Sequence, residues 1–307
     1  MRRALTVVGA LSNVGARPYE DGAARDLHLA PDVLRERGLI TRLGAIDMGD
    51  VVAPAYLDFR KPLHGSRNEA QVAAYSRTLG RRVAAATAQG EFGVVVGGDC
   101  SVVLACLLAA RKKAGEGLGL VYIDAHADFA VEEESESVAT MALALAIGHG
   151  RSPLASLAGP VGLVDSGHAA LIGRRDDAVE SRGAATFASP AILEVPSAQL
   201  RSDDWLELAA LTLDRVAGPA CPGFWIQLDV DVLNPVIMRA VDSPEPGGPS
   251  PAELVRFMSP LVRHPKALGL SLTSYDPALD PDRSCARQLV SLLEALFAPV
   301  VSLTPVS

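Results

Sequence analysis

The sequence has few cysteines, few aromatic residues and no long uninterrupted apolar run. Its cysteines, Cys100, Cys106, Cys221 and Cys285, form no Cys-x-x-Cys pair, which excludes a disulfide scaffold and indicates a reducing compartment. No apolar stretch approaches the roughly 20 residues of a membrane span, and no basic run could neutralise a row of phosphates. We therefore expect a cytoplasmic protein with no membrane and no nucleic-acid partner.

The chain is long and apolar enough to bury a large core. It has 307 residues, 49% hydrophobic and 21% charged, and its formal net charge of −8 argues against a polyanionic partner. The apolar run Ala4–Leu11 follows two arginines, but it is short for the apolar region of a secretory signal. We expect residues 1–307 to form one domain that acts on a small molecule.

Apolar runs of strand length alternate with helical patterns along the chain. The predicted strands are Leu5–Val8, Gly93–Val96, Leu118–Ile123, Ala170–Ile172, Phe224–Leu228 and Ala267–Leu272. The predicted helices are Pro31–Arg37, Glu69–Ala88, Ser101–Ala114, Val138–Ile147, Asp203–Ala217, Pro251–Val262 and Ser284–Phe297. Strands without polar alternation are typical of a parallel sheet that is covered on both faces, so the pattern predicts a doubly wound α/β fold.

Three of the predicted strands end in polar clusters. These clusters are Gly97–Ser101, Asp124–Asp128 and Asp229–Asp231. In an open parallel sheet, function collects at the carboxyl ends of the strands. Taken singly, each cluster has a structural explanation: a tight turn, a helix cap or a buried histidine. The three together in this order favour a functional site.

The polar clusters carry the side chains of a metal site. Alternate residues of an extended backbone point to one face, so Asp124, His126 and Asp128 can converge, as can Asp229 and Asp231. Uncompensated, four gathered carboxylates could not all stay ionised. Two divalent metal ions fit this number of ligands better than one tetrahedral ion. The predicted metal ligands are Cys100, Asp124, His126, Asp128, Asp229 and Asp231.

With these motifs the sequence resembles the ureohydrolase family, which comprises arginases, agmatinases, formiminoglutamases and their relatives. The resemblance covers most of the chain. It rests on Leu29–Leu39, Gly97–Ser101, Tyr122–Phe129, Gln227–Pro235, Ser243–Gly248 and the helix that contains Cys285-Ala286-Arg287.

The resemblance implies a three-layer α/β/α fold with an eight-stranded, mainly parallel sheet. It also implies a dinuclear manganese site whose bridging hydroxide attacks a guanidinium or amidine carbon, and a homotrimer or hexamer. Carried over position by position, Asp124 and Asp229 would bridge the metals and hold the hydroxide. Asp128 and Cys100 would bind one metal, and His126 and Asp231 the other.

Cys100 departs from the family pattern, which has histidine at this position. A coordinating thiol loses its proton, so four carboxylates and one thiolate would carry a formal charge of about −5 against +4 from two divalent ions. Sulfur also shifts metal preference from manganese towards zinc or ferrous iron. The alternative is that Cys100 is a small buried apolar residue beside a one-metal site.

Further departures concern substrate handling. Ser274-Tyr275-Asp276-Pro277 aligns with the family's Glu-Val-Asn-Pro, so Ser274 replaces the acid beneath the guanidinium and Asp276 is a candidate substitute. Where the family has a histidine that shuttles protons, this sequence has Ala139. Arg175-Asp176 resembles the family's Arg-Asp, so Arg175 and Asp176 are candidate substrate-binding residues. The family's next substrate-contacting residue is an aspartate, and this sequence has Ala178 at that position.

These departures leave three hypotheses open. The first is a dinuclear-metal hydrolase of a linear amidine or guanidino compound other than ordinary L-arginine, similar to the branch that hydrolyses N-hydroxylated arginine. The second is a non-catalytic, metal-binding descendant of the family. The third is a thiol-dependent hydrolase with Cys100 as nucleophile and His126 as base.

Overall fold

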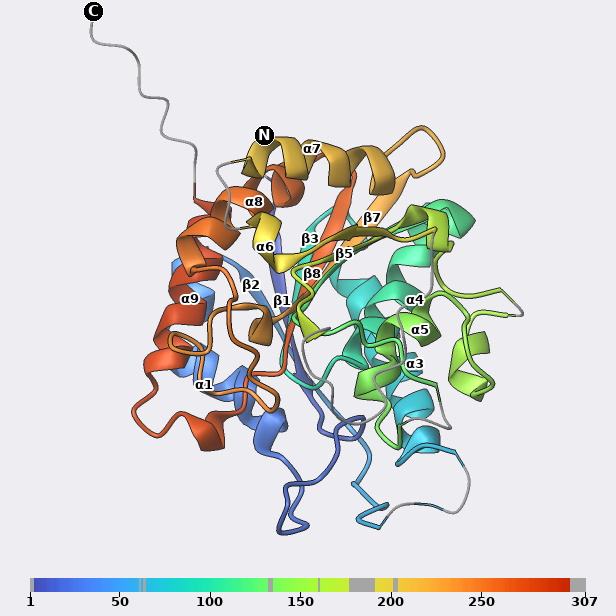
Figure 1. Ribbon diagram of the computed structural model, residues 1–307, viewed down its shortest axis with the longest axis vertical. Coiled ribbons are helices and arrows are strands. Elements are labelled where there is room, and N and C mark those ends of the chain that lie inside the picture. The colour runs from blue at the N-terminus through green and yellow to red at the C-terminus, as the bar shows by residue number, and fades with distance from the viewer. Residues whose placement is uncertain are drawn as a thin grey trace, which may run out of the picture.

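A parallel sheet forms the middle layer of the fold (Figure 1). The computed structural model describes residues 3–60, 62, 65–131, 135–159, 161–176, 191–200 and 204–298. Within these ranges the strands are β1 (Leu5–Leu11), β2 (Ile46–Val52), β3 (Phe92–Val96), β4 (Leu118–Ile123), β5 (Ala169–Ile172), β6 (Leu193–Val195), β7 (Gly223–Asp229) and β8 (Ala267–Thr273). They form an eight-stranded sheet in the order β2-β1-β3-β8-β7-β4-β5-β6, and every pairing is parallel.

Helices cover both faces of this sheet. In the described residues they are α1 (Ala30–Glu36), α2 (Leu39–Leu43), α3 (Glu69–Ala86), α4 (Val102–Ala114), α5 (Ala142–Ala146), α6 (Ser197–Leu200), α7 (Trp205–Val216), α8 (Pro251–Arg263) and α9 (Ser284–Phe297). One hydrophobic core joins the sheet to α1, α2 and α6–α9, and a second joins it to α3, α4 and α5. Figure 1 shows these two helical layers on opposite sides of the strands. The predicted three-layer α/β/α fold is confirmed.

The two cores explain why the central strands lack polar alternation. In β3, Val94 packs into the first core and Val95 into the second, because successive side chains of a strand point to opposite faces. Both faces are covered, so both sets of side chains must be apolar. Trp225 of β7 lies close to neighbouring strands because Gly269 lacks a side chain, and a Cβ at Gly269 would come within 2.3 Å of the indole.

All six predicted strands are present, and two further strands escaped prediction. β2 lies at the sheet edge and is largely exposed, so its sequence is polar and carries no buried-strand signal. β6 is only three residues long. The predicted start of a helix at Pro251 is confirmed, and Ser250 caps it. Ser250 Oγ accepts from the backbone N–H of Glu253, whose carboxylate accepts from the N–H of Ser250.

The sheet order brings the predicted polar clusters together. β3, β8, β7 and β4 are consecutive neighbours in the sheet. The Gly97 N–H donates to the carbonyl of Leu272, and the Ser274 N–H donates to the carbonyl of Gly98, so the loops after β3 and β8 stay paired beyond the strands. Four strands therefore deliver side chains to one edge. No helix in the described ranges combines the length and the apolarity that crossing a membrane requires.

Candidate metal centre

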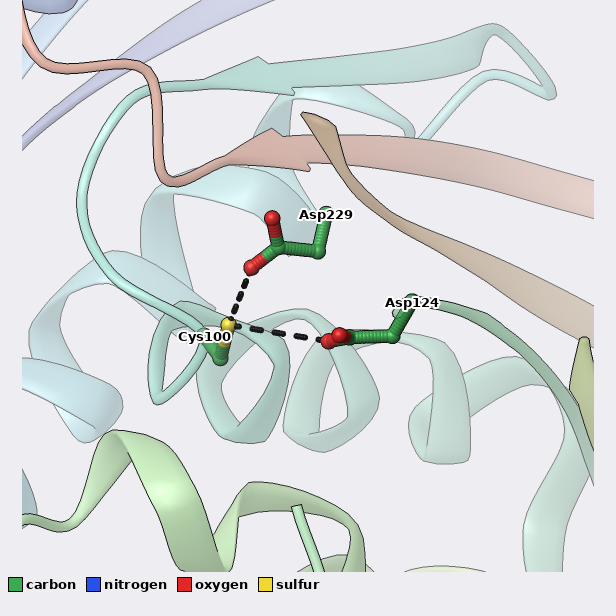
Figure 2. A group of neighbouring side chains, drawn as sticks. All are labelled: Cys100, Asp124 and Asp229. Atoms are coloured by element: carbon green, nitrogen blue, oxygen red, sulfur yellow. Dashed lines mark hydrogen bonds between the residues drawn. The ribbon is translucent and has the colours of Figure 1, made fainter. Parts of the chain in front are cut away.

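Cys100, Asp124 and Asp229 form a first group of metal-ligand side chains (Figure 2). Cys100 follows β3, Asp124 follows β4 and Asp229 ends β7, and all three are buried. The Cys100 thiol donates to Asp229 Oδ2 at 2.6 Å, and its sulfur lies 4.0 Å from Asp124 Oδ2. One potential donor atom from each residue lies within 4.8 Å of the others, which is close enough to surround a single cation.

Asp124, His126 and Asp231 form a second group of the same kind. His126 Nδ1 lies 2.9 Å from Asp231 Oδ2 and 3.5 Å from Asp124 Oδ1. The local backbone fixes both carboxylates, because Asp124 accepts from the His126 N–H at 2.7 Å and Asp231 accepts from the Ala125 N–H at 3.2 Å. Asp124 belongs to both groups and therefore links them.

Asp128 and Ser274 border these groups without belonging to them. Asp128 Oδ2 accepts from the Tyr122 hydroxyl at 2.5 Å, and the backbone at Asp128 is left-handed with φ of 46°. Ser274 Oγ donates to Asp229 and lies 3.4 Å from the Cys100 sulfur. The hydroxyl of Ser274 thus contacts two of the predicted metal ligands.

The carboxylates of the site are electrostatically unbalanced in the absence of a cation. Burial, followed by repulsion from Asp231, raises the pKa of Asp124 and Asp229 well above the ordinary value. Burial also raises the pKa of Asp128 to about 7. His126 is the single basic side chain among the described residues that line the cleft. It contacts Asp231 and Asp124, so the group formed by Cys100, Asp124 and Asp229 contains no basic side chain.

Cys100, His126 and Asp231 respond to the same environment in different ways. Burial and the neighbouring carboxylates raise the pKa of the Cys100 thiol well above its usual range. Burial disfavours the charged form of His126, but Asp231 and Asp124 outweigh it and raise the His126 pKa to about 12. Burial also opposes the charge of Asp231, yet its pairing with His126 holds the pKa of Asp231 below the ordinary value.

The residues of the two groups fit divalent cations. A cation in each would supply the positive charge that the buried carboxylates lack. Carboxylate oxygen and imidazole nitrogen suit manganese, iron and zinc, whereas the thiol of the first group favours the softer zinc and ferrous ions. Cys100, Asp124 and Asp229 would hold one ion, and Asp124, His126 and Asp231 the other.

A cleft of about 290 Å³ opens onto both groups. Six of its residues are the predicted metal ligands, and Ser274, Asp176 and Ala139 also line it. The sequence indicated no individual role for the other lining residues, although some lie within its motifs: Ala127, Phe129, Ala130, Ser135, Thr140, Asp242 and Ser243. Ala178, where the sequence places a lost substrate contact, is outside the described residues.

Of the candidate substrate-binding residues Asp176, Asp276 and Arg175, only Asp176 is among the described residues that line the cleft. Asp176 lies in the cleft wall, where it accepts from the Ala127 N–H at 3.2 Å and pairs with Arg174 at 2.6 Å. Asp276 is fully buried beside the site, where it accepts from the Tyr19 hydroxyl and from the Ala278 N–H. Arg175 and Asp276 are not among the described residues that line the cleft.

Arg175 binds backbone carbonyls beneath the site. Its guanidinium donates to the carbonyls of Asp231 at 2.8 Å, Val232 at 3.0 Å and Glu245 at 2.8 Å. It therefore joins the loop after β7, which carries a metal-ligand side chain, to the loop around Glu245.

Replacing Arg175 with glutamine is expected to lower the free energy of unfolding by roughly 1.5–3 kcal/mol, because charged hydrogen bonds are lost and carbonyls are left without donors. Urea denaturation measures the change. Arg42→Gln is the matched control, since Arg42 pairs with the exposed Glu294 at the surface and should cost below about 1 kcal/mol. Equal stability of the two variants would contradict the bridging role of Arg175.

Comparison with known proteins agrees with this architecture. A model of the arginase family matches residues 22–298. An arginase of Staphylococcus aureus (strain COL) is 26% identical over 308 residues, which span 96% of this chain and 97% of the relative.

Two solved structures have a similar fold. The crystal structure of the arginase from Bacillus subtilis superposes with a TM-score of 0.82 at 24% identity and covers 97% of this chain and 99% of that one. The proclavaminate amidino hydrolase of Streptomyces clavuligerus gives a TM-score of 0.69 at 16% identity, covering 96% and 92%.

Proposed function

Because this chain belongs to the arginase family, we propose that it is a metal-dependent hydrolase that cleaves a C–N bond of a linear amidine or guanidino-type small molecule. The observation that carries the proposal is the pair of metal-ligand groups that share Asp124 and line one cleft. The chemistry that divalent ions supply in such a site is activation of water near neutral pH and stabilisation of developing negative charge.

The side chains of this protein hold and orient that centre. Asp124 contributes to both groups, so it fixes the two cation positions relative to each other. The Tyr122 hydroxyl orients Asp128, and the Ser274 hydroxyl orients Asp229. His126 pairs with Asp231 and would have to be neutral to hold a metal, so it would give up a proton when an ion binds.

Ordinary L-arginine is not the substrate that we propose. The resemblance places a carboxylate at position 274, where it would meet the guanidinium, but Ser274 is neutral and its hydroxyl is already used by Asp229. Ala139 lines the cleft at the position of the shuttle histidine. A hydroxylated guanidine has a lower pKa, so it depends less on both missing groups.

A product assay tests this proposal. The fully metal-loaded protein is incubated with arginine, N-hydroxyarginine, agmatine, guanidinobutyrate and formiminoglutamate, and release of urea, hydroxyurea, formamide or ammonia is measured. We expect turnover of at least one compound, with arginine slower than N-hydroxyarginine. Absence of turnover across the panel would overturn the proposal.

The first metal group supports a second proposal, that its cation is zinc or ferrous iron rather than manganese. A thiolate ligand favours these softer ions. Metal quantitation with anomalous scattering identifies each ion next to Cys100, and cobalt substitution should produce a sulfur-to-metal charge-transfer absorption that Cys100→Ser abolishes. Manganese in both positions would contradict this preference.

A non-catalytic metal-binding protein is the alternative that Ala139 and Ser274 support, because both stand where substrate-handling groups are expected. In that case Cys100→His would change metal affinity and thermal stability without producing turnover. Measured turnover by the Cys100→His protein would exclude this alternative.

A further inference from the structure

Two arginines converge on Asp242 at one side of the cleft. Asp242 lines the cleft, and we call Arg17, Arg25 and Asp242 the Asp242 rim. Arg25 lies 2.5 Å from Asp242 Oδ1, and Arg17 donates to both Asp242 oxygens at 3.3 Å. Two guanidinium groups facing one carboxylate leave the rim with one positive charge in excess.

The two arginines are held differently. The side chain of Arg25 is 8% exposed and donates to the carbonyl of Arg17 at 3.0 Å. Its guanidinium carbon lies over the ring of Tyr19, 4.6 Å from the ring centroid. Arg17 is 51% exposed and its bonds to Asp242 are long. An exposed ion pair of this kind contributes about 0–1 kcal/mol to the free energy of unfolding. Arg25 therefore neutralises Asp242, and the guanidinium of Arg17 can leave Asp242 to bind another anion.

The backbone holds Arg17 beside the cleft. The Gly15 N–H donates to buried Asp99 at 3.0 Å, and the Gly15 carbonyl accepts from the N–H of Ala139, itself a cleft residue. The Tyr56 hydroxyl donates to the carbonyl of Ala16 at 3.0 Å. The residues before Arg17 are therefore tied to the cleft residue Ala139, and its side chain contacts the cleft residue Asp242.

We propose that Arg17 recognises a carboxylate on the substrate, so that the site selects amidino or guanidino acids over the amines left by their decarboxylation. This inference rests on the proposed function. A guanidinium binds a carboxylate through two parallel hydrogen bonds. The other lining carboxylates are the metal-group residues, Asp128 with Tyr122, and Asp176 with Arg174. Among the described cleft residues and their ion-pair partners, only the Asp242 rim holds a surplus cation.

The test compares two compounds that share a guanidino head and differ at the other end: guanidinobutyrate, which ends in a carboxylate, and agmatine, which ends in an amine. Their dissociation constants for the metal-loaded protein are measured by calorimetry, and kcat/KM is measured where turnover occurs. We expect tighter binding of guanidinobutyrate. Arg17→Gln should reduce this preference by about tenfold, and Arg17→Lys, which keeps the charge but not the two parallel hydrogen bonds, should retain only part of it.

Asp242→Asn separates recognition from a merely structural role of Arg17. If Arg17 only braces Asp242, the Asp242→Asn and Arg17→Gln variants should behave alike. If Arg17 binds the substrate carboxylate, Asp242→Asn frees it and should increase the preference for guanidinobutyrate. Arg42→Gln, remote from the cleft, should leave the preference unchanged.

The outcomes also separate this inference from the proposed function. Turnover of the panel with an equal effect of Arg17→Gln on both compounds would overturn the role of Arg17 and leave the hydrolase assignment standing. A binding preference that depends on Arg17, without turnover of any compound, would support the recognition site and overturn the hydrolase. Binding of neither compound would overturn the inference.

Discussion

Asp124→Ala should strip both cations from the protein and abolish its activity, because Asp124 is the residue shared by the two metal-ligand groups. Loss of water activation and of charge stabilisation, at several kcal/mol, corresponds to a fall in kcat/KM of roughly 10³-fold or more. Metal content after dialysis, measured by plasma mass spectrometry, should fall from about two ions per chain to below about 0.2. The assay substrate is whichever panel compound the protein turns over.

Removal of a buried carboxylate elsewhere provides the control. Asp280 is fully buried, accepts from the N–H of Cys285 and of Ala286 at the start of α9, and is not among the described residues that line the cleft. Asp280→Asn should lower stability yet retain both ions. An Asp124→Ala protein that keeps one tightly bound ion would show that the groups are independent and that Asp124 does not link them.

The convergence of these side chains could be predicted from sequence because it follows from two simple regularities. Buried strands without polar alternation predict a parallel sheet, and parallel strands end at the same edge. The alternation of Asp124 with His126, and of Asp229 with Asp231, then places each pair on one side. The same rule places Asp128 with them, and Asp128 does line the same cleft, although its backbone is left-handed and its carboxylate accepts from the Tyr122 hydroxyl.

The features that escaped prediction depend on contacts between distant parts of the chain. β2 is polar along Asp47, Gly49 and Asp50, and it is a strand because it pairs with β1 at the sheet edge. The contact of Arg17 with Asp242 joins residues 225 positions apart. The loops that contain Arg17 and Asp242 have no hydrophobic periodicity, so no local sequence pattern predicts the Asp242 rim.

The apparent metal affinity is expected to rise steeply with pH, by roughly 100-fold per unit if two protons leave, since each released proton contributes about tenfold. The pKa values of Asp124, Asp229 and the Cys100 thiol lie well above their ordinary ranges in the metal-free protein. Folding therefore shifts these groups towards their protonated forms, whereas a bound cation favours their ionised forms, so cation binding should release protons.

The metal-free protein should in turn lose stability as pH rises. A carboxyl whose pKa is raised by folding stabilises the fold below its unfolded pKa, and this contribution is lost as pH rises through the folded value, which for Asp128 is about 7. The raised pKa of His126 likewise stabilises the fold, and this contribution falls as pH rises above the unfolded pKa of about 6.5. The lowered pKa of Asp231 contributes a constant term above about pH 4.

Two measurements check these signs together. Chelator-competition calorimetry between about pH 6 and pH 8, in buffers of different ionisation enthalpy, gives the affinity and the number of protons released. Thermal unfolding with and without chelator gives the stability of each form. Cys100→Ser is the matched variant: a serine hydroxyl keeps its proton where the thiol must lose it to bind a metal, so one fewer proton should be released and the slope should fall by about tenfold per unit. A flat affinity profile, or a metal-free protein that becomes more stable from pH 6 to 8, would mean that the buried carboxylates are already ionised and balanced by another cation.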